Sequence, residues 1–245
     1  MRARASLLVA SLLASAVLAS CSRFPGKPGP GPEVPRPDSV LDPVALFSQN
    51  CQGCHGADGK NGPAMMLSDP VYLALADDET LRTVISKGRP GTAMSAFAQK
   101  EGGMLTDEQV NAIIRGIRER WSKPNALGGD AAPPYAAKSA GDAARGQAVY
   151  GTYCASCHGA YGNGGPKAGS IVNHAYLSLI TDQGLRTIVI AGRPDFNAPD
   201  WRNNVPGHPM SDQEITDVVA WLDSQRPNRA VGVAANSASP TGGAQ

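Results

Sequence analysis

Apolar residues recur at helical spacing in two stretches of this chain, residues 43–121 and 142–226. In each stretch the pattern predicts one helix near the start, one in the middle and one at the end, and no run alternates as a strand would. The sequence therefore predicts an all-α fold with two tandem small helical domains, called here the first block and the second block. The apolar helix positions are Leu46, Phe47, Leu81, Val84, Ile85, Ile113, Ile114 and Ile117 in the first block, and Val149, Tyr150, Leu185, Ile188, Val189, Val218, Val219 and Leu222 in the second.

The ends of these helices carry recognisable signals. Gly88 and Gly192 follow the middle helices, each with a proline two residues further on, which is typical of a helix that stops at the glycine. The last helices open with Thr106-Asp107-Glu108-Gln109 and Ser211-Asp212-Gln213-Glu214. Both segments have the form of a capping box, so we expect the last helices to begin there.

The two blocks repeat one another, with the register moving by a single residue between the matching segments given below. Duplication of one small domain explains this repeat most simply. The matching segments are Cys54-His55-Gly56-Ala57 with Cys157-His158-Gly159-Ala160, Gly62-Pro63 with Gly165-Pro166, Tyr72-Leu73 with Tyr176-Leu177, Leu81-Arg82-Thr83 with Leu185-Arg186-Thr187, and Gly88-Arg89-Pro90 with Gly192-Arg193-Pro194.

The segments outside the blocks are poor in helical pattern and rich in small residues or proline. Proline-rich chain favours an extended tether, whereas Ala, Gly and Pro between two folded domains favour a flexible linker. The predicted segments are a lipoprotein signal peptide at 1–20, a Pro-rich tether at 21–42, a linker at 122–141 and a disordered tail at 227–245.

The N-terminus has the pattern of an export signal. Arg2 and Arg4 precede an apolar run, Ser6 to Ala19, that is too short to cross a membrane. Leu18-Ala19-Ser20-Cys21 resembles the lipobox of bacterial lipoproteins, which implies cleavage before Cys21 and its lipidation. The alternative is an ordinary secretory signal followed by an unrelated thiol. We expect an exported, membrane-anchored lipoprotein that faces the periplasm or the cell exterior.

The strongest chemical signal is a pentapeptide that occurs twice, Cys51-Gln52-Gly53-Cys54-His55 and Cys154-Ala155-Ser156-Cys157-His158. C-x-x-C-H attaches c-type haem, because two thiols three positions apart can bond to one porphyrin edge while the histidine binds the iron. Four thiolates could instead hold zinc, but zinc pairs usually lie only about 15–20 residues apart. A thioredoxin-like dithiol lacks its βαβ surroundings here. We therefore predict two covalent haem c groups and no zinc.

Composition agrees with two haems. Only 5% of the residues are aromatic, which is few for two self-sufficient cores, and bound porphyrins would fill that volume. The formal net charge of +1 comes without a basic stripe, so we expect no nucleic-acid partner.

Both blocks resemble the class I type of cytochrome c domain, in which a methionine before the last helix is usually the sixth iron ligand. The resemblance makes Met94, in Gly88-Arg89-Pro90-Gly91-Thr92-Ala93-Met94, the expected ligand of the first haem, beside His55. The competing methionines are Met65, Met66 and Met104. It also implies that the carbonyls of Pro63 and Pro166 accept a hydrogen bond from the proximal histidines His55 and His158. The alternative for both prolines is a simple turn.

The second block departs from this pattern, because Ala198 stands where the first block has Met94. Met210 precedes the last helix and is expected to pack on Ile215 as a hydrophobic staple, with iron ligation as the alternative. His208 and His174 are further candidates for the sixth ligand, and an open site is the remaining one.

The resemblance implies electron transfer between redox partner proteins of an extracytoplasmic respiratory chain. Two alternatives remain at this point. An open sixth site on the second haem would allow peroxidase-like chemistry, and the chain could also be a cytochrome subunit of a larger respiratory complex.

Overall fold

All regular secondary structure is helical in the residues that the computed structural model describes, which are residue 31 and residues 34–227. Strand-like pairing among them is limited to two isolated bridges, Ala98 with Leu105 and Arg193 with Ala198. The prediction of an all-α fold is confirmed. The signal peptide, Cys21, most of the tether and nearly all of the predicted tail lie outside the described residues.

The first block belongs to a compact unit that begins at Val40. Short polar side chains cap the N-termini of its helices. Asp42, Asp69 and Asp77 each accept a hydrogen bond from a backbone N–H in the first turn of the following helix, which satisfies a donor that has no partner within the helix. The short 3-10 helix η2 (Pro37–Ser39) precedes this unit. The elements of the block are α2 (Pro43–Asn50), α3 (Gln52–His55), α4 (Pro70–Leu75), α5 (Asp78–Lys87), the 3-10 helix η3 (Gln99–Glu101) and α6 (Asp107–Trp121).

The second block repeats this order of elements within the same unit. Asp142, Asn173, Thr181 and Ser211 cap its longer helices. The elements are α7 (Ala143–Tyr153), α8 (Ala155–His158), α9 (His174–Ser178), α10 (Asp182–Ala191), the 3-10 helix η4 (Pro194–Phe196) and α11 (Asp212–Ser224).

The predicted helix ends are confirmed. Gly88 and Gly192 end α5 and α10 with φ of 66° and 76°, a left-handed conformation that glycine adopts without steric cost. Both capping boxes are formed, at the starts of α6 and α11. In each, the hydroxyl of Thr106 or Ser211 accepts from the backbone N–H three positions later, and the side chain of that later residue accepts from the N–H of the capping residue.

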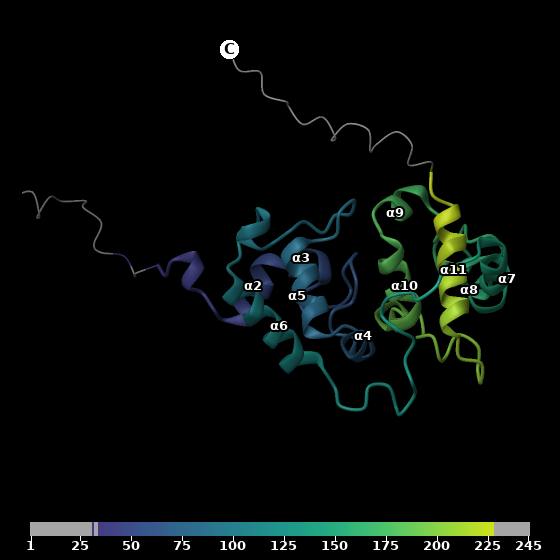
Figure 1. The fold of residues 1–245 in the computed structure, drawn as a ribbon, viewed down its shortest axis with the longest axis horizontal. Helices are drawn as coiled ribbons and strands as arrows, with labels where there is room; N and C mark the ends of the chain where they lie inside the picture. The colour runs from purple at the N-terminus through teal and green to yellow at the C-terminus, as the bar shows by residue number, and fades with distance from the viewer. Residues whose placement is uncertain (1–30, 32–33, 228–245) are drawn as a thin grey trace, which may run out of the picture. The chain divides into compact units, whose positions relative to one another are not determined.

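In each block the first helix packs against the last, α2 on α6 and α7 on α11 (Figure 1). An aromatic pair lies at each contact, Phe47 with Trp121 at 5.1 Å between ring centroids and Tyr150 with Trp221 at 4.3 Å. The helices approach so closely that a Cβ atom at Gly146 would lie 2.0 Å from the carbonyl oxygen of Asp217. Glycine at this position therefore sets the distance between α7 and α11.

We expect Gly146→Ala to destabilise the second block by about 1–3 kcal/mol, because overpacking pushes α11 away from α7. Gly151→Ala in the same helix is the matched control, since a Cβ atom there meets nothing within 4 Å. The control should be neutral or stabilising by roughly 0.5–1 kcal/mol, because alanine favours a helix more than glycine does. Urea denaturation of both variants measures the difference, and equal stabilities would contradict the packing argument.

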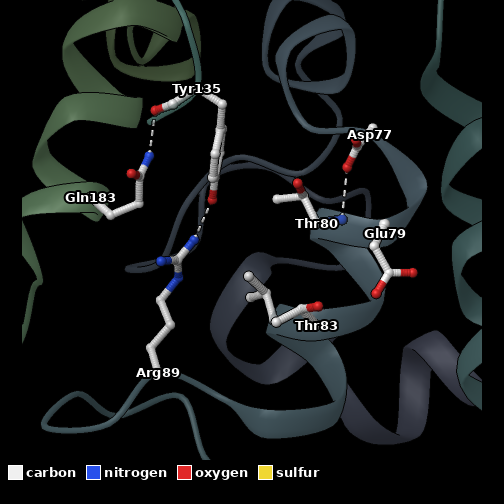
Figure 2. A pocket seen from close by; sticks show the side chains of 8 residues that line it. Asp77, Glu79, Thr80, Thr83, Arg89, Tyr135 and Gln183 are labelled. Carbon is white, nitrogen blue, oxygen red and sulfur yellow. Dashed lines mark hydrogen bonds between the residues drawn. The ribbon is translucent and has the colours of Figure 1, made fainter. Parts of the chain in front are cut away.

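The linker at 122–141 differs from the flexible segment that its composition predicts. The buried guanidinium of Arg186 donates to the carbonyl of Pro134 at 2.8 Å, and Arg202 donates to the carbonyl of Leu127 at 2.8 Å. A pocket of about 310 Å³ lies beside the linker, and Arg89 donates there to the Tyr135 hydroxyl at 2.7 Å (Figure 2). Arginine side chains of both blocks therefore hold the linker by hydrogen bonds. The composition of the linker does not predict these tertiary contacts.

Candidate functional site

The first C-x-x-C-H motif forms a tight turn at the end of α2. Cys51 caps that helix, and its carbonyl accepts hydrogen bonds from the N–H groups of Cys54 at 3.2 Å and His55 at 3.0 Å. This places both thiols and the imidazole within one turn, from Cys51 at the N-cap of α3 to His55 at its end. The second motif repeats the geometry, with the carbonyl of Cys154 accepting from Cys157 at 3.2 Å and His158 at 3.0 Å.

A glycine brings the following loop back across each motif. A Cβ atom at Gly62 would lie 2.2 Å from the carbonyl oxygen of Cys54, and one at Gly165 would lie 2.6 Å from that of Cys157. The sequence draws attention to the Gly-Pro pairs at these positions. The structure shows that the glycine is required there, because only hydrogen fits between the loop and the motif.

The imidazole of each motif is held by a backbone carbonyl that the sequence did not predict. Nδ1 of His55 lies 2.7 Å from the carbonyl oxygen of Met65, and Nδ1 of His158 lies 2.8 Å from that of Gly169. The predicted partners, Pro63 and Pro166, are therefore wrong, because the loops carry carbonyls two or three residues later to the rings. A proton fixed on Nδ1 leaves Nε2 as the nitrogen that can bind a metal.

The two histidines differ in burial. His55 is 8% exposed, whereas His158 is half-buried. Burial lowers the pKa of His55, the Met65 carbonyl opposes this, and the positive charge of Arg193 lowers the pKa further. His55 is thus the neutral imidazole at neutral pH, which is the form that coordinates iron.

The four thiols of the two motifs are free, without a disulfide in the described part of the chain. Burial, followed by the neighbouring thiol of Cys54, raises the pKa of Cys51 to about 12. Burial, followed by Cys157, raises the pKa of Cys154 to about 11. These two side chains are therefore protonated thiols at neutral pH.

These donors fit haem c. Each turn offers two thiols and one oriented imidazole, while residues 34–227 contain no group of three or more His, Cys, Asp or Glu side chains close enough to hold a bare metal ion. The hydroxyl of Ser86 is buried without a hydrogen-bond partner, next to the loop that carries Met94, since the Ser86 carbonyl accepts from Ala98 at 3.2 Å. A buried unpaired hydroxyl is costly, so its presence fits a site that holds a further group.

The equivalence of Met94 and Ala198 is visible in the backbone. The carbonyl of Met94 accepts from the N–H of Arg89 at 2.8 Å, and the carbonyl of Ala198 accepts from the N–H of Arg193 at 2.9 Å. Met94 is half-buried on its loop. Its role as an iron ligand stays a prediction, and the second block has alanine at the same place.

Met210 occupies the position of Leu105 in the first block. The N–H of Met210 donates to Trp201 at 2.9 Å, as the N–H of Leu105 donates to Phe97 at 2.7 Å. Both side chains belong to the core, with Met210 only 2% exposed. This placement favours packing over ligation for Met210. His174 and His208 are exposed, on α9 and on the loop before α11.

Each block matches the model of a known protein family. Residues 143–226 match the Cytochrome c family, and residues 38–115 match the family of cytochrome c oxidase, cbb3-type, subunit III. Each block is therefore similar to a cytochrome family. These matches imply covalently bound haem c and support haem-based electron transfer.

Two individual proteins share some similarity with this chain. A segment of 72 residues, 29% of this chain, is 39% identical to part of the dihydro-heme d1 dehydrogenase of Pseudomonas aeruginosa, and it spans 13% of that protein. A structure titled as the reducing HAO-like protein complex of Kuenenia stuttgartiensis matches with a TM-score of 0.43 and 17% identity, covering 79% of this chain and 100% of that chain. Among the described residues, no helix has the length and apolar character needed to cross a bilayer.

Proposed function

We propose that this chain is a dihaem electron-transfer protein with one haem c in each block. One observation carries the proposal: both motifs form the same turn, and in both a backbone carbonyl holds Nδ1 of the histidine, at 2.7 Å and 2.8 Å. The residues that would hold the haems are Cys51, Cys54 and His55 in the first block and Cys154, Cys157 and His158 in the second, with Met94 as the further ligand in the first.

When bound, haem c supplies an iron that gains or loses a single electron. The chain's own residues prepare the sites for this change. The carbonyls of Met65 and Gly169 fix the two rings, so little of either site has to rearrange. Burial of His55 shields its imidazole from water. A thioether from Met94 would favour the reduced iron. These features support a higher reduction potential at the first site than at the second.

Export and a lipid anchor at Cys21 are part of the proposal, supported by the N-terminal pattern and by the cytochrome c character of both blocks. The Pro-rich tether would keep the blocks near a membrane-bound donor or acceptor and raise its effective concentration. The expected partners are redox proteins of a respiratory chain. Purification in mild detergent separates a free lipoprotein from a subunit that travels with an oxidase or reductase, and Cys21→Ser should release the protein from the membrane.

Mass spectrometry of the denatured mature protein tests the number of cofactors. Protein from a host that matures c-type cytochromes should carry the mass of two haems, because thioether bonds survive denaturation. A single haem, or none, would contradict the proposal. Tryptic peptides that contain each motif should carry one haem each, which excludes two haems on one segment.

A second candidate function rests on Ala198, which cannot ligate iron at the position of Met94. An open sixth position on the second haem would bind peroxide or another small oxidant. Addition of cyanide to the oxidised protein tests this: a rapid spectral change at one haem supports an open site. Absorption and EPR spectra that show both haems fully low-spin before cyanide is added would eliminate this version of the second function.

A further inference from the structure

The loop that follows α10 reaches beyond its own block. The N–H of Asn61 donates to Oδ2 of Asp195 at 2.9 Å, and Nη2 of Arg193 donates to the carbonyl of Gly62 at 3.0 Å. Asn61 and Gly62 belong to the first block, Arg193 and Asp195 to the second. The two hydrogen bonds join residues more than a hundred positions apart in the chain.

Arg193 and Asp195 also bind each other in a bidentate ion pair. Nε of Arg193 lies 2.9 Å from Oδ1 of Asp195, and Nη2 lies 2.9 Å from Oδ2. The two side chains are 12% and 1% exposed. A buried charge is tolerated when it is paired and hydrogen-bonded, and here the carboxylate has both the guanidinium and the Asn61 N–H. The guanidinium lowers the pKa of Asp195, so the pair stays charged at neutral pH.

The pair contacts the part of the first block that shapes its haem-attachment turn. Gly62 is the glycine that passes against the carbonyl of Cys54, and Asn61 beside it has a left-handed φ of 61°. A Cβ atom at Gly62 would also lie 2.8 Å from the carbonyl carbon of His55. Because Arg193 donates to the carbonyl of Gly62, the contact lies close to His55 in the first site.

The first block has no equivalent of this pair. Its matching segment is Arg89-Pro90-Gly91, with glycine in place of Asp195, and Arg89 donates to the hydroxyl of Tyr135 instead. The same loop of the second block has Ala198 where the first has Met94. The second copy of the loop has thus lost the expected iron ligand and gained a carboxylate that binds the other block.

We propose that Arg193 and Asp195 are positioning residues that dock the loop after α10 on the first haem-attachment loop, and that the charge of Arg193 raises the reduction potential of the first haem. The docking stands on the contacts alone, whereas the effect on the potential rests on the proposed function. A positive charge favours the reduced iron, since that form carries one positive charge less.

The docking is tested by hydrogen exchange in the full-length holoprotein. Asp195→Ala should speed exchange of the Asn61 amide hydrogen about tenfold or more, because the Asn61 N–H loses its charge-assisted hydrogen bond to the buried carboxylate. Asp217→Asn is the matched control, since Asp217 is also buried and accepts from an arginine and a backbone N–H, but entirely within the second block. If Asp195→Ala does not fold, Asp195→Asn keeps the size and an acceptor while it removes the charge.

Unchanged exchange of the Asn61 amide in a folded Asp195 variant would overturn the docking.

The electrostatic part is tested by redox titration. Arg193→Gln should lower the reduction potential of the first site, and Arg193→Lys should restore most of it. Equal potentials in wild type and Arg193→Gln would overturn that part. If mass spectrometry found no haem, the proposed function would fail while Asn61 exchange would still decide the docking.

Discussion

Serine at both Cys51 and Cys54 will leave a chain with a single covalent haem, bound to the second block. The imidazole of His55 remains oriented by the Met65 carbonyl, but without thioether bonds its haem is lost on denaturation. The first block should also lose stability, because the porphyrin is expected to fill a core that is poor in aromatic residues. Mass spectrometry and the haem absorbance, which should fall to about half, measure the loss.

The matched variant replaces Cys154 and Cys157 with serine and should leave a single haem on the first block. Circular dichroism of the two variants, followed during heating, shows whether each block depends on its own haem. A double-serine variant that still carried two covalent haems would contradict the assignment of these thiols. Variants with one haem and wild-type thermal stability would contradict the dependence of the core on the porphyrin.

Alanine at Met94 should lower the reduction potential of the first haem. The thioether is a soft donor that favours reduced iron, and axial ligands tune haem potentials over a range of roughly 0.8 V. We expect a fall on the order of a tenth of a volt, together with loss of the methionine-to-iron charge-transfer band in the far-red spectrum. Redox titration and absorption spectroscopy of the purified protein measure the two effects.

Met210→Ala is the contrasting variant. Its side chain is 2% exposed in the core, so its removal should cost about 2–5 kcal/mol of stability and leave both haem spectra unchanged. Met210→Leu, which copies Leu105 of the first block, should cost less than about 1.5 kcal/mol. Loss of the charge-transfer band in Met210→Ala, with the band kept in Met94→Ala, would reverse the assignment of the ligand.

The features that the sequence predicted correctly depend on neighbours along the chain. Helix caps at Thr106 and Ser211 and the helix-ending glycines Gly88 and Gly192 involve residues within a few positions. The repeat also placed Met210 at the position of Leu105, as the backbone hydrogen bonds confirm. Such local features can be predicted because the interacting residues are close together in the sequence.

The features that the sequence did not reveal depend on the conformation of loops and on contacts between residues far apart in the chain. Proline at position 63 suggested the carbonyl that binds His55, but the loop brings the carbonyl of Met65 to the ring. The linker looked flexible from its composition, but arginines from α10 and the loop before α11 occupy its carbonyls. Hydrogen bonds join Asp195 to Asn61 and Arg193 to Gly62 between the blocks, and no spacing in the sequence predicts them.

The attachment of the linker to Arg186 determines where the chain can be cut. This guanidinium is 2% exposed and shares its donors among Pro134, Thr216 and Asp212. A fragment that starts at residue 142 would leave some of those donors buried without an acceptor, at a cost of about 1–3 kcal/mol for each. A fragment that starts before Leu127 would keep the carbonyls bound by Arg186 and Arg202, so it is the better choice for producing the second block alone.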